Sequence, residues 1–233
     1  MSDRSATMNA PTQTTPLRPG WPEAIVAVLV SAVLTIVGMT ASILIPDNAV
    51  LLRGHRDFLV AGLAPLIGFA AAVSLRIRDL RPFGFRRVAP RWILVGVGVA
   101  LACFLLSWPV SAVFDPLFPA ENIQTTYQDA AMASATSLAL TVLFGGVLTP
   151  LGEEAVFRGV LLNFLGRWGS WVAVPLSVAI FALAHGINNV LPMAFLVGIC
   201  AGLLLTVTRS IWPAIVVHMV YNSAGMLYHG LAS

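Results

Sequence analysis

The sequence predicts an all-α protein, a polytopic transmembrane bundle of about seven to eight helices. Of its 233 residues, 58% are hydrophobic and only 10% are charged, whereas about a quarter of a soluble domain is charged. The mean hydropathy of +0.88 points the same way. Seven apolar runs follow one another, and most approach the ~20 residues that cross a bilayer. They are Glu23–Ile45, Phe58–Leu75, Trp92–Phe114, Ser137–Leu165, Trp171–Gly186, Val190–Thr208 and Ile211–Tyr228.

The chain divides into a tail, a first group of spans and a polar-containing membrane core. Residues 1–20 are rich in Ser, Thr, Pro and Gln and lack periodicity, which predicts a disordered cytoplasmic tail. Residues 21–136 form the N-terminal membrane spans, and residues 137–228 form the core. The first run is too long for a signal-peptide core, so we expect it to remain in the mature protein.

Two of the runs depart from a simple span. The fourth is long and contains Gly145, Gly146 and Pro150, which predict a kink on a segment that faces the bundle interior. The fifth is short, so we expect it to lie partly within protein. In the sixth, Gly198 and Gly202 have the GxxxG spacing that indicates close helix packing. The two cysteines lie in apolar runs without a CxxC spacing, which indicates small buried residues.

The distribution of arginine predicts the orientation in the membrane. All thirteen basic residues are Arg. Six of them lie between the second and third runs, whereas Asp115–Thr136 has no basic residue. The positive-inside rule therefore places the first of these loops and the N-terminus in the cytoplasm, in the inner or plasma membrane of a bacterium. Arg53 and Arg56, in the expected first outer loop, count against this assignment. Because the arginines flank apolar segments, nucleic acid is not an expected partner.

The fourth run carries charged residues where lipid would not accept them. Glu153, Glu154 and Arg158 lie within it, and each charge near the bilayer centre costs roughly 2.5–3.5 kcal/mol. Such residues face the bundle interior and are functional candidates. Glu154 and Arg158 are four residues apart, so they can pair on one helix face. Glu153 lies about 100° around the helix and is the freer carboxylate, which suits a general base.

Further polar residues lie at a similar depth in other runs. His185 follows Phe181 by four residues near the end of the fifth run, and His218 and Asn222 share one face of the seventh. Taken alone, each could be a buried side chain with a hydrogen-bond partner. At 1.5 Å per residue from turns on one membrane face, however, Glu153 lies about 20 Å deep, and His218 and Asn222 lie about 12 and 18 Å deep. His185 lies about 27 Å deep by the same count, or nearer 20 Å if its run starts at Trp171. The sequence therefore predicts one polar layer built by three helices.

The layer contains no obvious nucleophile, because the sequence has neither GxSxG nor a cysteine beside a base, and the zinc signature HExxH is absent. The chemistry that remains is hydrolysis in which a water molecule attacks the substrate. In one version Glu153, helped by His185, activates the water while His218 and Asn222 donate to an oxyanion. In the other, His185, His218 and Glu153 hold a zinc ion that activates it. The residue types do not separate these versions.

Three motifs in this order resemble the CPBP family of intramembrane proteases, which includes type II CAAX prenyl endopeptidases and Abi-type, bacteriocin-processing relatives. The motifs are EExxxR, FxxxH and HxxxN, and the stretches EEAVFRG and SIWPAIVVHMVYNS are typical as well. The similarity covers Leu138 to Gly225. The matching residues are Glu153, Glu154 and Arg158, then Phe181 and His185, then His218 and Asn222.

The resemblance implies a membrane-embedded endopeptidase whose catalytic core is residues 137–228. It implies that Glu153 and His185 activate water, that His218 and Asn222 form the oxyanion site, and that the substrate is a peptide or protein, membrane-associated in some relatives. The family includes descriptions as zinc metalloproteases and as glutamate proteases, so zinc stays an open cofactor. Recognition of a prenyl group does not transfer, because nothing in the sequence identifies a prenyl pocket.

Two other functions compete with this interpretation. A proton-coupled transporter also uses Glu, His and Arg within the membrane, but it would favour polar chains across the bilayer and an internal repeat, and the sequence shows neither. A non-catalytic membrane scaffold or immunity protein could use the same fold to hold a partner. Its polar layer would not need to be complete.

Overall fold

The computed structural model describes residues 18–44, 49–118 and 124–232, and over these residues the chain is helical without a β-strand. The all-α prediction is therefore confirmed. Seven long helical elements cross the molecule, and the short helix α4 (Thr125–Met132) is an eighth. Most of the predicted tail, residues 1–17, lies outside the described residues.

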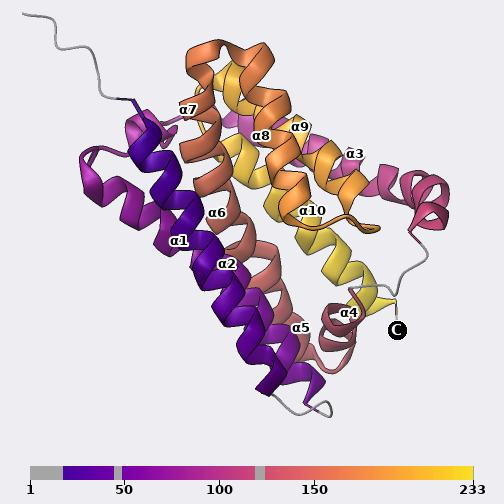
Figure 1. Cartoon of the computed structure of the whole chain (residues 1–233). Helices are drawn as coiled ribbons and strands as arrows, with labels where there is room; N and C mark the ends of the chain where they lie inside the picture. The colour runs from indigo at the N-terminus through magenta and orange to yellow at the C-terminus, as the bar shows by residue number, and fades with distance from the viewer. Residues whose placement is uncertain (1–17, 45–48, 119–123, 233) are drawn as a thin grey trace, which may run out of the picture.

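Helices α1 (Trp21–Thr40) and α2 (Val50–Leu75) run antiparallel along one side of the bundle (Figure 1). Pro22 lies in the first turn of α1, and the Glu23 carboxylate accepts a 2.7 Å hydrogen bond from the Gly20 N–H, which closes that end of the helix. Arg76, just after α2, contacts the same carboxylate at 2.7 Å. The ends of the two helices are thereby fixed to each other.

Helix α2 begins at Val50, eight residues before the predicted start at Phe58. Arg53 and Arg56 therefore lie in its first turns and not in a loop, which corrects the prediction. The Arg56 guanidinium donates to the Gly38 carbonyl of α1. Because this charge finds a partner on the neighbouring helix, a helical start is possible where the sequence alone favoured a loop.

Helix α3 (Pro90–Phe114) packs against α9 and α10. The Cys103 sulfur on α3 lies 3.9 Å from the Cys200 sulfur on α9. The predicted outer segment Asp115–Thr136 contains a 3₁₀ turn, Asp115–Leu117, and helix α4, which packs on α2 and α10.

The fourth predicted run is a single winding element whose helical register changes twice. It consists of α5 (Ala135–Thr141), a π-helical segment (Val142–Leu148), α6 (Thr149–Glu154), a second π-helical segment (Ala155–Leu162) and α7 (Asn163–Leu165). The irregularity predicted from Gly145, Gly146 and Pro150 is present, in the form of π turns. The Thr149 N–H bonds the Phe144 carbonyl five residues back, so in this register the Gly145 carbonyl faces Pro150, which has no N–H.

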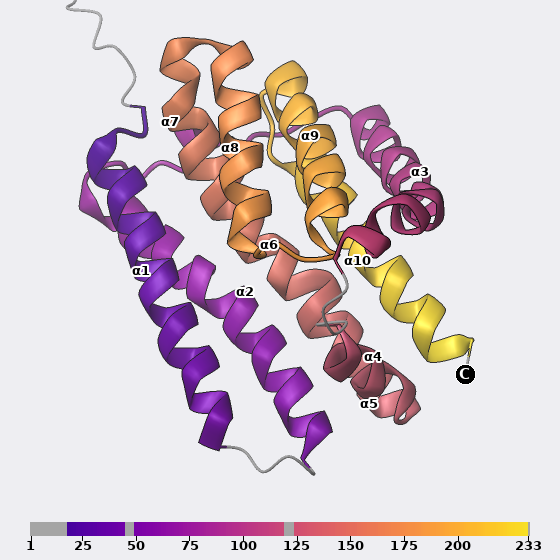
Figure 2. The ribbon, with the colours of Figure 1, turned by 45° about the vertical axis from the view of Figure 1, so that its right-hand side comes forward.

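The last three helices complete the bundle: α8 (Ser170–Ala184), α9 (Leu191–Thr208) and α10 (Trp212–Leu231). Helix α10 lies between α3 and the α5–α7 element, and the loop after α8 lies part of the way down the molecule (Figure 2). A Cβ on Gly198 or Gly202 would meet Val178, Phe181 or Val174 of α8 at 3.2–3.3 Å. The close packing predicted from the GxxxG spacing is therefore confirmed.

Five helical stretches among the described residues are long and apolar enough to span a membrane: α1, most of α2, α3 with its following turn, the α5–α7 element and α9. Helix α8 has 15 residues, about 22 Å at 1.5 Å per residue, which is short of about 30 Å of hydrocarbon. Helix α10 is as long as α1 but contains polar residues such as His218 and Asn222. Helices α8 and α10, which are not among these five, position most of the polar residues that face Glu153.

Candidate active site

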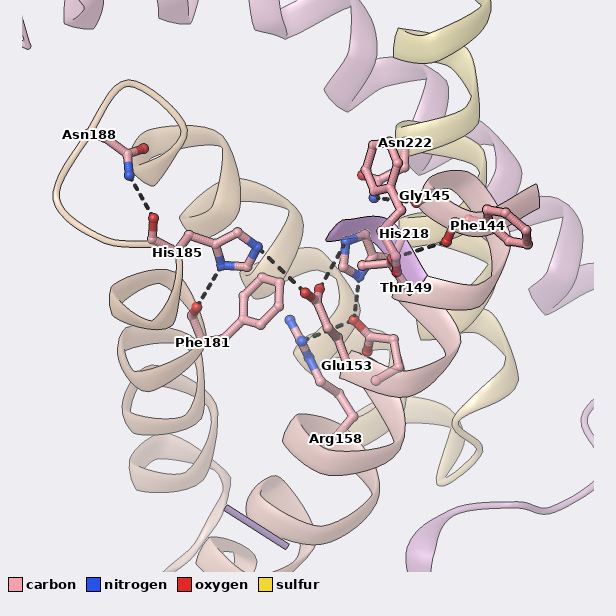
Figure 3. Close-up of polar contacts among 12 residues, drawn as sticks. Phe144, Gly145, Thr149, Glu153, Arg158, Phe181, His185, Asn188, His218 and Asn222 are labelled. Atoms are coloured by element: carbon pink, nitrogen blue, oxygen red, sulfur yellow. Dashed lines mark hydrogen bonds and ion pairs between the residues drawn. The ribbon is translucent and has the colours of Figure 1, made fainter. Parts of the chain in front are cut away.

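The seven predicted site residues lie in one cluster inside the bundle (Figure 3). Helix α6 and the following π-helical segment supply the acidic residues and an arginine, α8 supplies Phe181, and α10 supplies a histidine and an asparagine. His185 lies directly after α8, as its C-cap, and not within a helix as predicted. Gly186, at φ +85°, ends the helix because this backbone conformation favours glycine.

Glu154 is wholly buried and held by two partners. Its Oε1 lies 3.0 Å from Nη1 of Arg158 and 3.0 Å from Nδ1 of His218. The predicted ion pair one helical turn apart is thus present, with both side chains almost without exposure. A buried carboxylate with a guanidinium and an imidazole at one oxygen is poorly placed to act as a base. Glu154 is therefore suited to orienting His218.

Arg158 and Phe181 pack against each other at one side of the cluster. A second nitrogen of Arg158, Nη2, donates to the Gly198 carbonyl of α9 at 3.2 Å. The guanidinium lies 4.3 Å from the centre of the Phe181 ring, a cation–π contact. The same ring packs edge-on against His185 and His218, with centroids 4.8 and 5.6 Å apart. Phe181 therefore fixes the positions of three site residues by packing.

Glu153 is the carboxylate that faces both histidines. Its two oxygens lie 3.9 Å from Nε2 of His185 and 3.7 Å from Nε2 of His218. These separations exceed a hydrogen bond, and Oε2 of Glu153 is buried with no hydrogen-bond partner among the described residues. The side chain is 14% exposed and that of His185 is 26% exposed, so the cluster opens on the side of the loop after α8.

The partners of the two Nδ1 atoms indicate how the rings are protonated. Nδ1 of His185 lies 2.9 Å from the Phe181 carbonyl oxygen. A carbonyl only accepts, so this Nδ1 carries a proton. Nδ1 of His218 likewise donates to Glu154, whose oxygen also contacts the Arg158 guanidinium. Both rings therefore turn Nε2 toward Glu153, which is the arrangement needed to exchange protons with it.

Asn222 connects the site to the π-helical segment. Its Nδ2 donates to the Gly145 carbonyl at 3.2 Å, and the neighbouring Ser223 hydroxyl donates to the Gly146 carbonyl at 3.4 Å. These donors satisfy backbone oxygens next to Pro150. An amide has two N–H groups, and the hydrogen bond to the Gly145 carbonyl uses one of them.

Sequence reasoning missed three residues that support the site. The Thr149 hydroxyl contacts the Phe58 and Phe144 carbonyl oxygens at 3.1 and 3.0 Å, which ties α2 to α6 one turn before Glu153. Asn188 donates to the His185 carbonyl at 2.6 Å and fixes the loop that carries the histidine. The sequence signal that could have identified Asn188 is its place in a short turn, because asparagine side chains often bond nearby backbone groups there.

The third missed residue is Tyr127 on α4, which packs on Phe58 with ring centroids 4.4 Å apart. Burial raises the pKa of Tyr127 to about 12, and the charges of Asp57 and Glu153 contribute to the shift. The phenol is therefore close enough to sense the Glu153 charge and stays protonated at neutral pH. In the sequence, Tyr127 lies in the predicted outer segment, where no motif indicated a role in the site.

The predicted zinc ligands have the right chemistry, and both Nε2 atoms face the Glu153 carboxylate. Imidazole nitrogens whose other nitrogen is hydrogen-bonded, together with a carboxylate, are typical of zinc sites. Across residues 18–44, 49–118 and 124–232, however, no three His, Cys, Asp or Glu side chains are grouped closely enough to hold a metal ion. Zinc at this site therefore stays a prediction.

The fold and the cluster define a class of protein: a helical membrane protein with buried glutamates and histidines from separate helices. Residues 135–224 match the model of the family described as type II CAAX prenyl endopeptidase, Rce1-like. This segment extends from α5 into α10 and contains all seven site residues. The match confirms the predicted resemblance and supports a membrane endopeptidase at the level of the family.

The chain is also similar to two curated proteins, of which one has a name that states an activity. The chain is 28% identical over 199 residues to a protein of Escherichia coli named only as an uncharacterized 24.3 kDa protein, an alignment that covers 78% of this chain and 86% of the relative. It is 24% identical over 144 residues to the membrane-embedded CAAX protease MroQ of Staphylococcus aureus (strain USA300). That alignment covers 59% of this chain and 57% of MroQ. No solved structure matches the chain significantly.

Proposed function

We propose that this chain is an intramembrane endopeptidase that hydrolyses a peptide bond with a water molecule activated by Glu153. The observation that carries the proposal is the position of the Glu153 carboxylate, which faces Nε2 of both His185 and His218 at 3.7–3.9 Å without bonding either. A separation of this size suits a shared water better than a direct contact. The family match over residues 135–224 supports the reaction class.

The charges of the cluster favour one mobile proton. Glu153 and Glu154 supply two negative charges and Arg158 supplies one positive charge, so the buried layer has a net charge of −1 when both rings are neutral. When both rings are neutral, the Glu153 carboxylate and the two Nε2 atoms are three hydrogen-bond acceptors that face one another. The proposed mechanism assigns one added proton to the layer, which makes its net charge zero and gives these atoms a donor to share.

Attack begins when Glu153, assisted by His185, takes a proton from water as the oxygen adds to the carbonyl carbon. The peptide oxygen then becomes an oxyanion. His218, charged by the mobile proton and stabilised by Glu154 through Nδ1, donates from Nε2, and Asn222 donates its second N–H. When the tetrahedral intermediate collapses, the carbon–nitrogen bond breaks and Glu153 returns the proton to the leaving amine.

The proposed substrate is a membrane-associated peptide or protein segment. The site is buried among helices and opens beside the loop after the short helix α8, so an extended segment could enter only at the level of the membrane. The relative MroQ is named as a CAAX protease. A peptide ending in a CAAX sequence, with and without a prenyl group, is therefore a rational first probe. We place the protein in a bacterial plasma membrane, as both relatives come from bacteria.

The test uses purified chain in liposomes and quenched fluorescent peptides that include these probes. We expect wild-type chain to cleave at least one of them, and Glu153→Gln or His185→Ala to lower kcat by about 10²–10⁴, the usual contribution of acid–base catalysis. His229→Ala is the matched control, because this histidine lies on α10 near Gln128 and outside the cluster. Full cleavage by Glu153→Gln and His185→Ala would eliminate the mechanism.

Zinc dependence is tested in the same assay with a chelator and with zinc added back. The mechanism proposed here expects cleavage to persist in the chelator. Loss of cleavage that zinc restores would instead require Glu153, His185 and His218 to move together around the metal. Proton flux without cleavage in the same liposomes would favour a transporter.

A further inference from the structure

A second feature of the structure lies outside the candidate active site, at the C-terminal end of the α5–α7 element. It is a hollow of about 440 Å³ between the start of α1, the end of α2 and the end of α7. The residues that line it include three arginines, Arg18, Arg76 and Arg167, together with Trp21, Asn163 and Phe164. Cationic side chains from three separate parts of the chain converge there.

The structure holds two of these arginines in fixed positions. Arg76 contacts the buried Glu23 carboxylate through Nε at 2.7 Å and through Nη2 at 2.9 Å. Arg167 donates from Nε to the Phe164 carbonyl at 3.0 Å and from Nη2 to the Pro19 carbonyl at 3.1 Å, with its guanidinium 4.2 Å from the Phe164 ring centre. Guanidinium groups already ordered lose little entropy on binding an anion.

The net charge of the hollow is positive. The three arginines face one nearby carboxylate, Glu23, which is fully buried behind Arg76. Among residues 18–44, 49–118 and 124–232, two of the three positive charges therefore have no acidic partner lining the recess, which also contains aromatic rings. Such a recess favours a phosphate group, which accepts several guanidinium hydrogen bonds at once.

The surroundings of the hollow place it at the membrane surface. Trp21, Trp168 and Trp171 are 58%, 46% and 80% exposed at this end of the bundle, and exposed tryptophans are typical of the interfacial layer. Below Trp21, one face of α1 presents an exposed apolar stripe formed by Ile25, Leu29, Val33 and Ile36. The stripe begins one helical turn after Trp21, which lines the hollow.

We propose that this hollow is a binding site for an anionic phospholipid. The phosphate of the headgroup lies among Arg18, Arg76 and Arg167, and an acyl chain lies along the α1 stripe. A free phosphate ion would use the arginines alone, whereas a phospholipid uses the arginines and the adjoining stripe together. The lipid ties the start of α1 and the end of α2 to the α5–α7 element from outside, since Arg18 precedes α1, Arg76 directly follows α2 and Arg167 follows α7.

The test is native mass spectrometry of the purified chain in a non-ionic detergent, titrated with phosphatidylglycerol or with phosphatidylcholine. We expect phosphatidylglycerol to bind with one-to-one stoichiometry and more tightly. Arg18→Gln should weaken this binding about fivefold, the equivalent of about 1 kcal/mol for one arginine at an anionic surface. Arg18→Gln/Arg167→Gln should weaken it further. Arg91→Gln is the control, because it removes an exposed arginine at the start of α3, outside the hollow.

Three results would overturn the proposal: equal binding of the two lipids, equal loss in Arg91→Gln and Arg18→Gln, or displacement of phosphatidylglycerol by millimolar inorganic phosphate. The single variant decides the outcome if the double variant does not fold. Glu153→Gln should bind the lipid normally, since the catalytic cluster lies elsewhere. Failure of the proteolysis assay and failure of lipid binding are therefore separate outcomes.

Discussion

Glu153 and Glu154 are neighbours in sequence, yet the structure surrounds them differently. Glu154 is fixed by Arg158 and His218, whereas Glu153 faces the two Nε2 atoms without a bond. The difference arises because adjacent helical residues point about 100° apart. One carboxylate can therefore orient a histidine while the other remains reactive.

The first prediction concerns Arg158→Leu. The substitution leaves the buried Glu154 charge without its cation and also removes the contacts to the Gly198 carbonyl and the Phe181 ring. Removing one partner of a buried pair costs about 3–5 kcal/mol. We expect a loss of this size in the free energy of unfolding, measured by denaturation in mixed micelles, together with a lower rate of cleavage.

The control for that prediction is the double variant Glu154→Leu/Arg158→Leu. It removes both charges, so it should recover part of the stability lost in Arg158→Leu while remaining inactive. Wild-type stability in the single variant would show that the pair contributes nothing. A double variant as unstable as the single variant would assign the loss to packing against Phe181.

The sequence predicted that seven polar and aromatic residues lie together, but not the hydrogen bonds among them. The spacing of Glu154 and Arg158 within one helix was enough to predict their ion pair, because helical geometry is periodic. The contacts of His185 with the Phe181 carbonyl and of Asn222 with the Gly145 carbonyl use backbone oxygens. Every residue has such an oxygen, so the choice of acceptor depends on the fold.

At the scale of the helices, the contact between α2 and α6 determines where the acidic residues lie. A Cβ on Gly152 would collide with the Gly62 carbonyl oxygen of α2, and a Cβ on Gly62 would meet Leu148 and the Thr149 nitrogen. The two backbones thus approach without side chains between them. Glu153 directly follows this contact.

The second prediction is that Gly152→Ala separates α6 from α2. Overpacking of this kind costs about 1–3 kcal/mol, and the displacement should also lower cleavage by moving Glu153 away from the histidines. Gly98→Ala on α3 is the matched control, because a Cβ there has nothing within 4 Å. Both changes gain about 1 kcal/mol of helix propensity, so the difference in unfolding free energy reports the contact. Equal stability of the two variants would argue against close packing.

The helices themselves were largely predictable, because apolar length is a direct requirement of the bilayer. Two features were not. The start of α2 at Val50 depends on Arg56 reaching the Gly38 carbonyl of α1. The π-helical segment Val142–Leu148 depends on donors from α10 that satisfy carbonyls near Pro150. Both are tertiary effects that override the local pattern, and the sequence predicted only irregularity near Pro150.

At the scale of the whole molecule, the charges separate the two ends of the bundle. The end formed by the start of α1 and the turns after α7 and α9 includes Arg18, Arg167 and Arg209, as well as the six arginines that follow α2. The other end has Arg53 and Arg56, and Arg56 is engaged by the Gly38 carbonyl of α1. Because these two arginines lie within helix α2 and not in an outer loop, they count less strongly against a cytoplasmic N-terminus.

The third prediction is therefore that the arginine-rich end faces the cytoplasm and that the end of α10 faces outward. In a background with Cys103→Ala and Cys200→Ala, single cysteines are introduced as Arg87→Cys and Asp129→Cys, both exposed positions at opposite ends. A membrane-impermeant maleimide applied to intact spheroplasts should label Asp129→Cys only. Lysis should then allow Arg87→Cys to react to the same extent, which controls for accessibility. The reverse labelling pattern would invert the predicted topology and place the proposed lipid site in the outer leaflet. The buried cluster of Glu153 and the two histidines would have the same geometry in either orientation.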